Sequence, residues 1–153
     1  MYVVMIASEC APAAKVGGLA DVVFGLSREL ELRGHAVEII LPKYDCMRTD
    51  QVWNLQVSYR DLWVPWDGGA IRCTVWFGFV HGRKCFFIEP HSAQAYFARG
   101  TYYGFWDDPD RFADAPIGPD PGRAQVLECA QDVVVVPVRE RESEPAGVDD
   151  LAG

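Results

Sequence analysis

The fold is decided by residues 2–42, which read YVVMIASECAPAAKVGGLADVVFGLSRELELRGHAVEIILP. Residues 2–7 form an apolar run with the length of a buried parallel strand. Apolar residues then recur at helical spacing, at Leu19, Val22, Val23, Leu26 and Leu30. Gly34 marks the end of that helix, and a second apolar run, residues 37–41, ends at Pro42. Strand, helix and strand within about 40 residues predict a right-handed βαβ unit in a parallel sheet.

Residues 61–97 have a different character. Apolar, β-branched and aromatic stretches cover 61–66, 71–80 and 85–88, with turn signals at Asp67-Gly68-Gly69 and His81-Gly82-Arg83. They predict antiparallel strands that feed back into the main sheet, followed by a short helical turn over 93–97. The predicted fold class is therefore α/β, a Rossmann-like parallel sheet with an antiparallel hairpin insertion.

The composition excludes several classes of function. The chain has a net charge of −8 and no basic stripe, which argues against nucleic acid and anionic lipid as partners. The five cysteines show no C-x-x-C pair and no zinc spacing, so we expect thiols in a reducing cytosol and no metal site. His35, His81 and His91 are expected at the surface. Because Glu9 interrupts the N-terminal apolar run and no basic region precedes it, we expect no signal peptide, no membrane span and a cytoplasmic protein.

Chemistry is predicted in the loop that joins the first strand to the first helix. Residues 15–21 read KVGGLAD, and open α/β sheets bind ligands at this edge. Gly17 and Gly18 let a ligand approach the backbone, the helix N-terminus favours anions, and Lys15 adds a positive charge. The pattern is neither G-x-G-x-x-G nor a P-loop. An anion or nucleotide site and a plain glycine turn both remain open from these residues alone.

A series of motifs resembles the glycogen and starch synthase family. The first part is SECAP at 8–12 with KVGGLADV at 15–22, and the later motifs, in the family's order, are LPKY at 41–44, FIEP at 87–90, YYG at 102–104 and DRFA at 110–113. Val16 and the segment PKYDC at 42–46 look most similar to the branch related to plant starch synthases III and IV.

The resemblance implies one half of a GT-B fold, in which two Rossmann-like domains face a cleft. It implies glucose transfer from ADP-glucose (in some members UDP-glucose) to the non-reducing end of an α-1,4-glucan, with retention and without metal or other cofactor. By the same resemblance Lys15, Gly17 and Gly18 bind the donor's phosphates. Candidate glucan-side residues are Asp21, Tyr103 and Glu9.

Each glucan-side candidate has an alternative role. Asp21 organises its loop, meets a sugar hydroxyl or caps its own helix. Tyr103 meets a sugar ring or packs within its loop. Glu9 contacts a hydroxyl or orders the loop that follows it.

The resemblance ends near residue 113. Residues 1–113 are expected to be a partial N-terminal synthase domain, and residues 114–153 a divergent acidic, proline-rich tail that is disordered or frameshifted. Within that tail, 133–136 is the one stretch expected to be able to form a strand and cover the open sheet edge. We expect a truncated synthase that is inactive by itself. The alternatives are a non-catalytic glucan- or nucleotide-binding module and a non-functional gene fragment.

Overall fold

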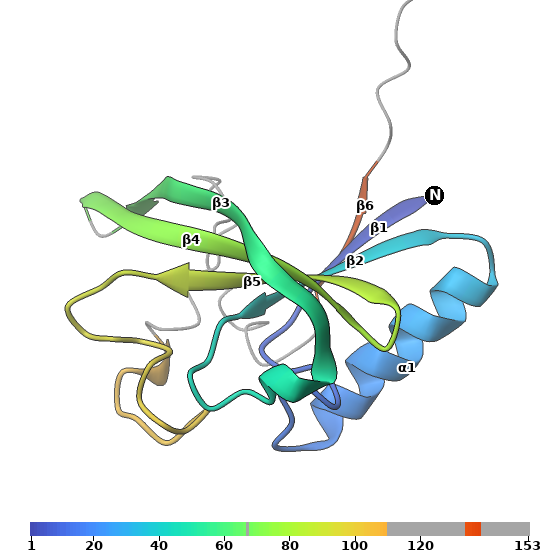
Figure 1. Ribbon diagram of the computed structural model, residues 1–153, viewed down its shortest axis with the longest axis horizontal. Helices are drawn as coiled ribbons and strands as arrows, with labels where there is room; N and C mark the ends of the chain where they lie inside the picture. Colours follow the sequence, from blue (N-terminus) through green and yellow to red (C-terminus); the bar gives the residue numbers. More distant parts are fainter. Residues whose placement is uncertain (67, 110–133, 139–153) are drawn as a thin grey trace, which may run out of the picture.

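One six-stranded sheet organises the molecule, in a computed structural model that describes residues 1–66, 68–109 and 134–138 (Figure 1). The elements in chain order are β1 (Tyr2–Ile6), α1 (Gly18–Leu32), β2 (Ala36–Pro42), η1 (Thr49–Gln51), β3 (Val52–Trp66), β4 (Gly69–Val80), β5 (Arg83–Pro90) and β6 (Val134–Val138). The strand order across the sheet is β3-β4-β5-β2-β1-β6.

The centre of the sheet is parallel and its flanks are antiparallel. β2 pairs in parallel with β1 and with β5, while β4 pairs antiparallel with both β3 and β5. The hairpin strands therefore return the chain to the parallel sheet, which confirms the predicted α/β class and the predicted insertion. The parallel strands β1, β2 and β5 all end on the same side of the sheet. This line of carboxyl ends is the edge at which the loop from β1 to α1 lies, and the amino ends of the same strands form the opposite edge.

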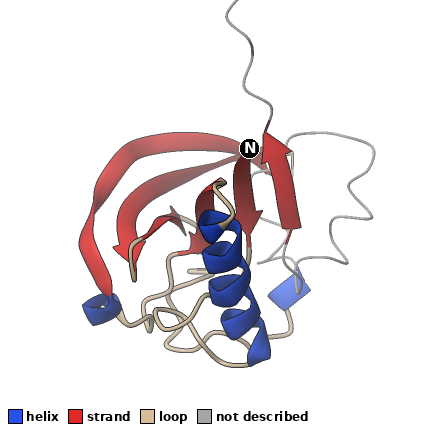
Figure 2. Cartoon of the chain, turned by 90° about the vertical axis from the view of Figure 1, so that its right-hand side faces the viewer, coloured by secondary structure: helices blue, strands red, loops and turns tan. Residues whose placement is uncertain are grey.

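The core lies between the sheet and α1, which packs across one face of it (Figure 2). Alternate side chains of the parallel strands point into this core, among them Met5, Ile39, Leu41 and Phe87, each at most 1% exposed. The helix contributes Ala20, Val23 and Ser27, with Leu19 and Leu30 partly buried.

The predicted helix is confirmed, but its apolar stripe is narrower than expected. Val22 and Leu26 are 56% and 38% exposed, because they lie on the flank of the face that Val23 and Ser27 turn to the sheet. Ser27 is tolerated in the core because its hydroxyl donates to the Phe24 carbonyl oxygen at 2.9 Å.

Two local predictions differ from the structure. β3 begins at Val52, well before residue 61, and its pairing with β4 shifts register three times. Those irregularities hid the period-2 pattern from the sequence. Residues 93–97 form hydrogen-bonded turns rather than a helix, and Ala95 there has a positive φ of 50°.

The edge of β1 is covered. β6 pairs antiparallel with β1 from Tyr2↔Val138 to Ile6↔Val134, so the strand predicted over 133–136 is confirmed with slightly shifted bounds. The remainder of the predicted tail lies outside the described residues.

Among the described cysteines, Cys10, Cys73 and Cys85 are buried and Cys46 is half-buried. Cys129 lies outside the described residues. His81 and His91 are exposed and His35 is half-buried. No helix in the described part of the chain is both long and apolar enough to span a membrane.

Candidate functional site

The loop over residues 8–18, which we call the glycine loop, follows the carboxyl end of β1 and leads into α1. Backbone hydrogen bonds hold it to the core. Cys10 and Ala14 exchange both backbone hydrogen bonds at 2.9 Å, and the Arg48 N–H donates to the Ala13 carbonyl at 2.8 Å. Cys10, Ala13 and Ala14 are almost fully buried, which anchors the first half of the loop. The second half, residues 15–18, is exposed.

The buried side chain of Glu9 orders the exposed second half of the glycine loop, residues 15–18. Its Oε2 accepts hydrogen bonds from the backbone N–H groups of Val16 at 2.7 Å and Gly17 at 3.0 Å, and the residue is only 4% exposed. Of the two roles open for Glu9, the contacts support loop ordering. They also engage the Gly17 N–H, so the backbone donors left for a ligand begin with Gly18. The N–H groups of that first helical turn have no carbonyl partner within the helix.

Lys15 and Asp21 form an ion pair across the same loop. Lys15 Nζ donates to both carboxylate oxygens of Asp21, at 2.7 and 2.8 Å, with the two side chains 48% and 59% exposed. The N-cap of α1 is Gly17, without a side-chain cap, so the capping role considered for Asp21 is wrong. Such an exposed pair is worth about 0–1 kcal/mol, and an incoming anion can replace it.

Tyr103 approaches the glycine loop from residues that are distant in sequence. Its hydroxyl donates to Glu9 Oε1 at 2.7 Å and lies 2.9 Å from Ser8 Oγ. Burial raises the pKa of the Tyr103 phenol well above its ordinary 10.0, and the neighbouring Glu9 carboxylate adds to the rise. A phenol is protonated at neutral pH even at its ordinary pKa, so Tyr103 donates to Glu9 there, and the raised pKa extends this to more alkaline pH.

The segment that carries Tyr103 is fastened independently of Glu9. The Gly100 N–H donates to both Asp45 carboxylate oxygens at 3.1 Å. Arg99 donates two 2.7 Å hydrogen bonds to Asp107, and its guanidinium lies 4.7 Å from the centre of the Phe105 ring. The neighbouring Tyr102 packs on Tyr44 and donates to the Cys46 carbonyl.

All six residues predicted from the sequence lie around this edge: Glu9, Lys15, Gly17, Gly18, Asp21 and Tyr103. Contacts or chain adjacency link them into one site. Sequence reasoning missed Ser8, Asp45 and the Arg99–Asp107 pair, which support the site. No spacing signal marks them, because their partners are between 8 and 95 residues away.

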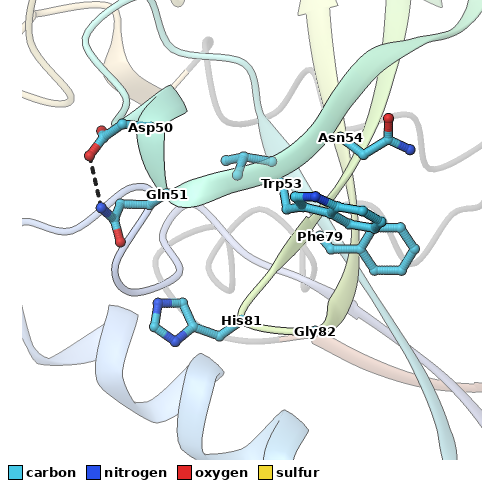
Figure 3. Close-up of a pocket in the computed structure, with 8 residues that line it drawn as sticks. Asp50, Gln51, Trp53, Asn54, Phe79, His81 and Gly82 are labelled. Atoms are coloured by element: carbon cyan, nitrogen blue, oxygen red, sulfur yellow. Dashed lines mark hydrogen bonds between the residues drawn. The ribbon is translucent and has the colours of Figure 1, made fainter.

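A shallow pocket elsewhere contains none of these residues (Figure 3). It lies where β3 begins beside the β4–β5 turn, and its lining is Asp50, Gln51, Val52, Trp53, Asn54, Phe79, His81 and Gly82. Because β5 runs parallel to β2 from Arg83 onward, this turn lies at the opposite edge of the sheet from the glycine loop. Within the described residues no group of three potential metal ligands gathers.

The fold and the position of the glycine loop define the class of protein. It is an open α/β domain whose glycine loop lies at the carboxyl ends of the parallel strands, where such domains bind ligands. Residues 2–117 match the family model of the starch synthase catalytic domain, and the chain belongs to this family. The family resemblance read from the motifs is therefore confirmed.

Curated relatives are glycogen synthases. The chain is 69% identical over 113 residues to glycogen synthase 1 of Synechococcus sp. (strain JA-2-3B'a(2-13)), covering 74% of this chain and 23% of the relative. It is 74% identical over 105 residues to glycogen synthase 2 of Methylococcus capsulatus, covering 69% and 22%. The chain thus spans less than a quarter of the length of these relatives.

A solved structure agrees with the motif-level resemblance to starch synthases III and IV. It is the catalytic domain of starch synthase IV from Arabidopsis thaliana bound to ADP and acarbose, with a TM-score of 0.70 and 44% identity. The match covers 82% of this chain and 24% of that one. The fold is that of part of a GT-B starch synthase catalytic domain.

Proposed function

We propose that this chain supplies the donor-phosphate loop and part of the glucan side of a glycogen or starch synthase. The reaction is transfer of glucose from ADP-glucose to the non-reducing end of an α-1,4-glucan, with retention of configuration. One observation carries the proposal: in a chain of this family, Glu9 holds the glycine loop and Tyr103 together at the carboxyl ends of the parallel strands.

The chemistry of the loop suits a leaving diphosphate. Negative charge grows on the diphosphate as the glucosyl bond breaks, and positioned donors there lower the barrier. Lys15 gives a mobile cation once it leaves Asp21, and the N-terminus of α1 gives backbone N–H groups from Gly18 onward. Asp21 holds Lys15 beside the loop when no ligand is bound.

A ligand in a similar protein supports the choice of donor and acceptor. The matching starch synthase IV structure contains ADP and acarbose. By similarity we assign a nucleotide sugar and a glucan to this chain, with no cofactor beyond the donor. A location in the cytoplasm follows from the same proposal.

A binding measurement on the 153-residue protein tests the role of Lys15. We expect Lys15→Ala to weaken ADP binding in calorimetric titration by about tenfold, the value of one hydrogen bond to a charged group. Lys84→Ala is the matched control, because Lys84 is also an exposed lysine near a carboxylate, Glu38 at 3.8 Å, but lies at the other sheet edge. Equal ADP affinity in the two variants would contradict the proposal.

Catalysis is tested in a chimera, because the matched region is only 23% of the Synechococcus relative. Residues 1–113 replace the corresponding segment of that glycogen synthase, and glucose transfer from ADP-glucose is measured. We expect an active chimera that loses most of its activity with Lys15→Ala, while the 153 residues alone transfer no glucose.

The second candidate function is a non-catalytic glucan- or nucleotide-binding module. It is favoured by the observation that Glu9, Lys15 and Tyr103 already form an ordered edge within this chain. An inactive chimera together with saturable binding of ADP or maltoheptaose by the 153-residue protein would select this module. An inactive chimera without binding would point to a non-functional fragment.

A further inference from the structure

Glu9 is a buried carboxylate with three donors on two segments of the chain. Oε2 receives the N–H groups of Val16 and Gly17, and Oε1 receives the Tyr103 hydroxyl. The residue is 4% exposed, so these donors take the place of water around its charge. A buried charge that loses a donor is strongly destabilised unless the other donors rearrange.

We propose that Glu9 is a positioning residue that couples the glycine loop to Tyr103. The hydrogen bonds from Val16 and Gly17 set the path of the loop into α1, and the bond from Tyr103 sets the tyrosine ring beside it. A displacement of either segment changes the donors left to the same carboxylate. The two segments, 94 residues apart at Glu9 and Tyr103, therefore share one conformational equilibrium.

The Lys15–Asp21 pair at the same site behaves differently. It is about half exposed, so water replaces either partner at little cost and an anion can take Lys15. Water cannot replace the donors to the buried Glu9 carboxylate in this way. The hydrogen bonds of Glu9 therefore persist while Lys15 moves. If the proposed function holds, occupation of the diphosphate loop and of the glucan side influence one another through Glu9.

The test is amide hydrogen exchange on the full 153-residue protein, followed by NMR. Tyr103→Phe removes only the hydroxyl, and the segment keeps its Asp45–Gly100 and Arg99–Asp107 fastenings. We expect exchange of the Val16 and Gly17 amides to speed up by between about threefold and tenfold, the effect of one weakened hydrogen bond. Tyr102→Phe is the matched control, since its hydroxyl donates instead to the Cys46 carbonyl.

Glu9→Gln gives a second, stronger test, in which the charge is lost and the size kept. We expect a larger acceleration at the same two amides, with the midpoint of urea unfolding recorded for every variant. Unchanged exchange at Val16 and Gly17 in Tyr103→Phe would overturn the proposal. So would an equal acceleration across the whole chain, because that reports global destabilisation.

These readouts need no ligand and are separate from the proposed function. If Lys15→Ala did not weaken ADP binding, the proposed function would fail, but the amide-exchange evidence for the role of Glu9 would be unaffected. Conversely, uncoupled exchange in Tyr103→Phe would remove the role of Glu9 while leaving ADP binding intact.

Discussion

At the scale of single residues, Gly78 in β4 shows how closely two strands approach. A Cβ atom there would lie 2.6 Å from Val52 Cγ1 and 3.3 Å from both Leu55 Cα and the Trp53 carbonyl oxygen. The backbone of β3 blocks the space, so a rotamer change of Val52 alone does not relieve the contact.

We expect Gly78→Ala to lower the free energy of unfolding by about 1–3 kcal/mol, as overpacked cores do. Gly25→Ala is the control, because Gly25 lies within α1 and an added Cβ meets nothing within 4 Å. There we expect a gain of about 0.5–1 kcal/mol from helix propensity. Urea unfolding measures both, and a Gly78→Ala variant as stable as the parent would contradict the close approach.

At the scale of an element, α1 ends in a Schellman motif centred on Gly34. The His35 N–H donates to the Leu30 carbonyl at 3.1 Å and the Gly34 N–H to the Glu31 carbonyl at 2.9 Å. Gly34 has φ +82°, in the left-handed region. The stop signal expected from Gly34 is thus confirmed together with its mechanism.

We expect Gly34→Ala to cost about 1–2 kcal/mol, since an L side chain is disfavoured in the left-handed region. Arg33→Ala, at the exposed C-cap with φ −87°, is expected to change stability by less than about 0.5 kcal/mol. Thermal or urea unfolding that ranked the two variants equally would refute the motif's contribution.

The sheet also shows what sequence patterns can and cannot predict at this scale. α1 was predictable from the helical spacing of its apolar residues, and β1 and β2 were predictable from short apolar runs bounded by loop residues. The start of β3 was not, because positive φ angles at Asn54 and Asp61 and repeated register shifts break its alternation. Tertiary pairing with the regular β4 holds it as a strand nonetheless.

At the scale of the whole molecule, buried thiols make stability sensitive to alkaline pH. Burial raises the pKa of Cys10 from 9.0 to about 12, and it also raises the pKa of Cys85. Burial raises the pKa of Tyr102 from 10.0 to about 12. In the unfolded chain these groups ionise near their ordinary values, while the folded chain keeps their protons.

The unfolded state therefore binds fewer protons above about pH 9, and stability falls from there toward pH 12. We expect the urea concentration at the midpoint of unfolding, measured relative to its value at pH 8, to decline between pH 9 and pH 10.5. In Cys10→Ala the slope of that decline should be shallower, even though lost packing lowers stability at every pH. A parent protein with a flat profile over this range would show that burial does not retain these protons.

The sequence by itself determined the βαβ unit, the place of the glycine loop and the family, because these depend on periodicity and motifs within short stretches. Its motifs also pointed to Glu9, Lys15, Gly17, Gly18, Asp21 and Tyr103 as site residues, which lie together around the site, but not to Ser8 or Asp45. Only the tertiary structure decided which contacts these residues make with one another. The Glu9–Tyr103 bond, the β1–β6 pairing and the fit of Val52 over Gly78 join distant residues. Such contacts are set by packing and by the need to satisfy buried polar groups, for which local sequence carries no signal.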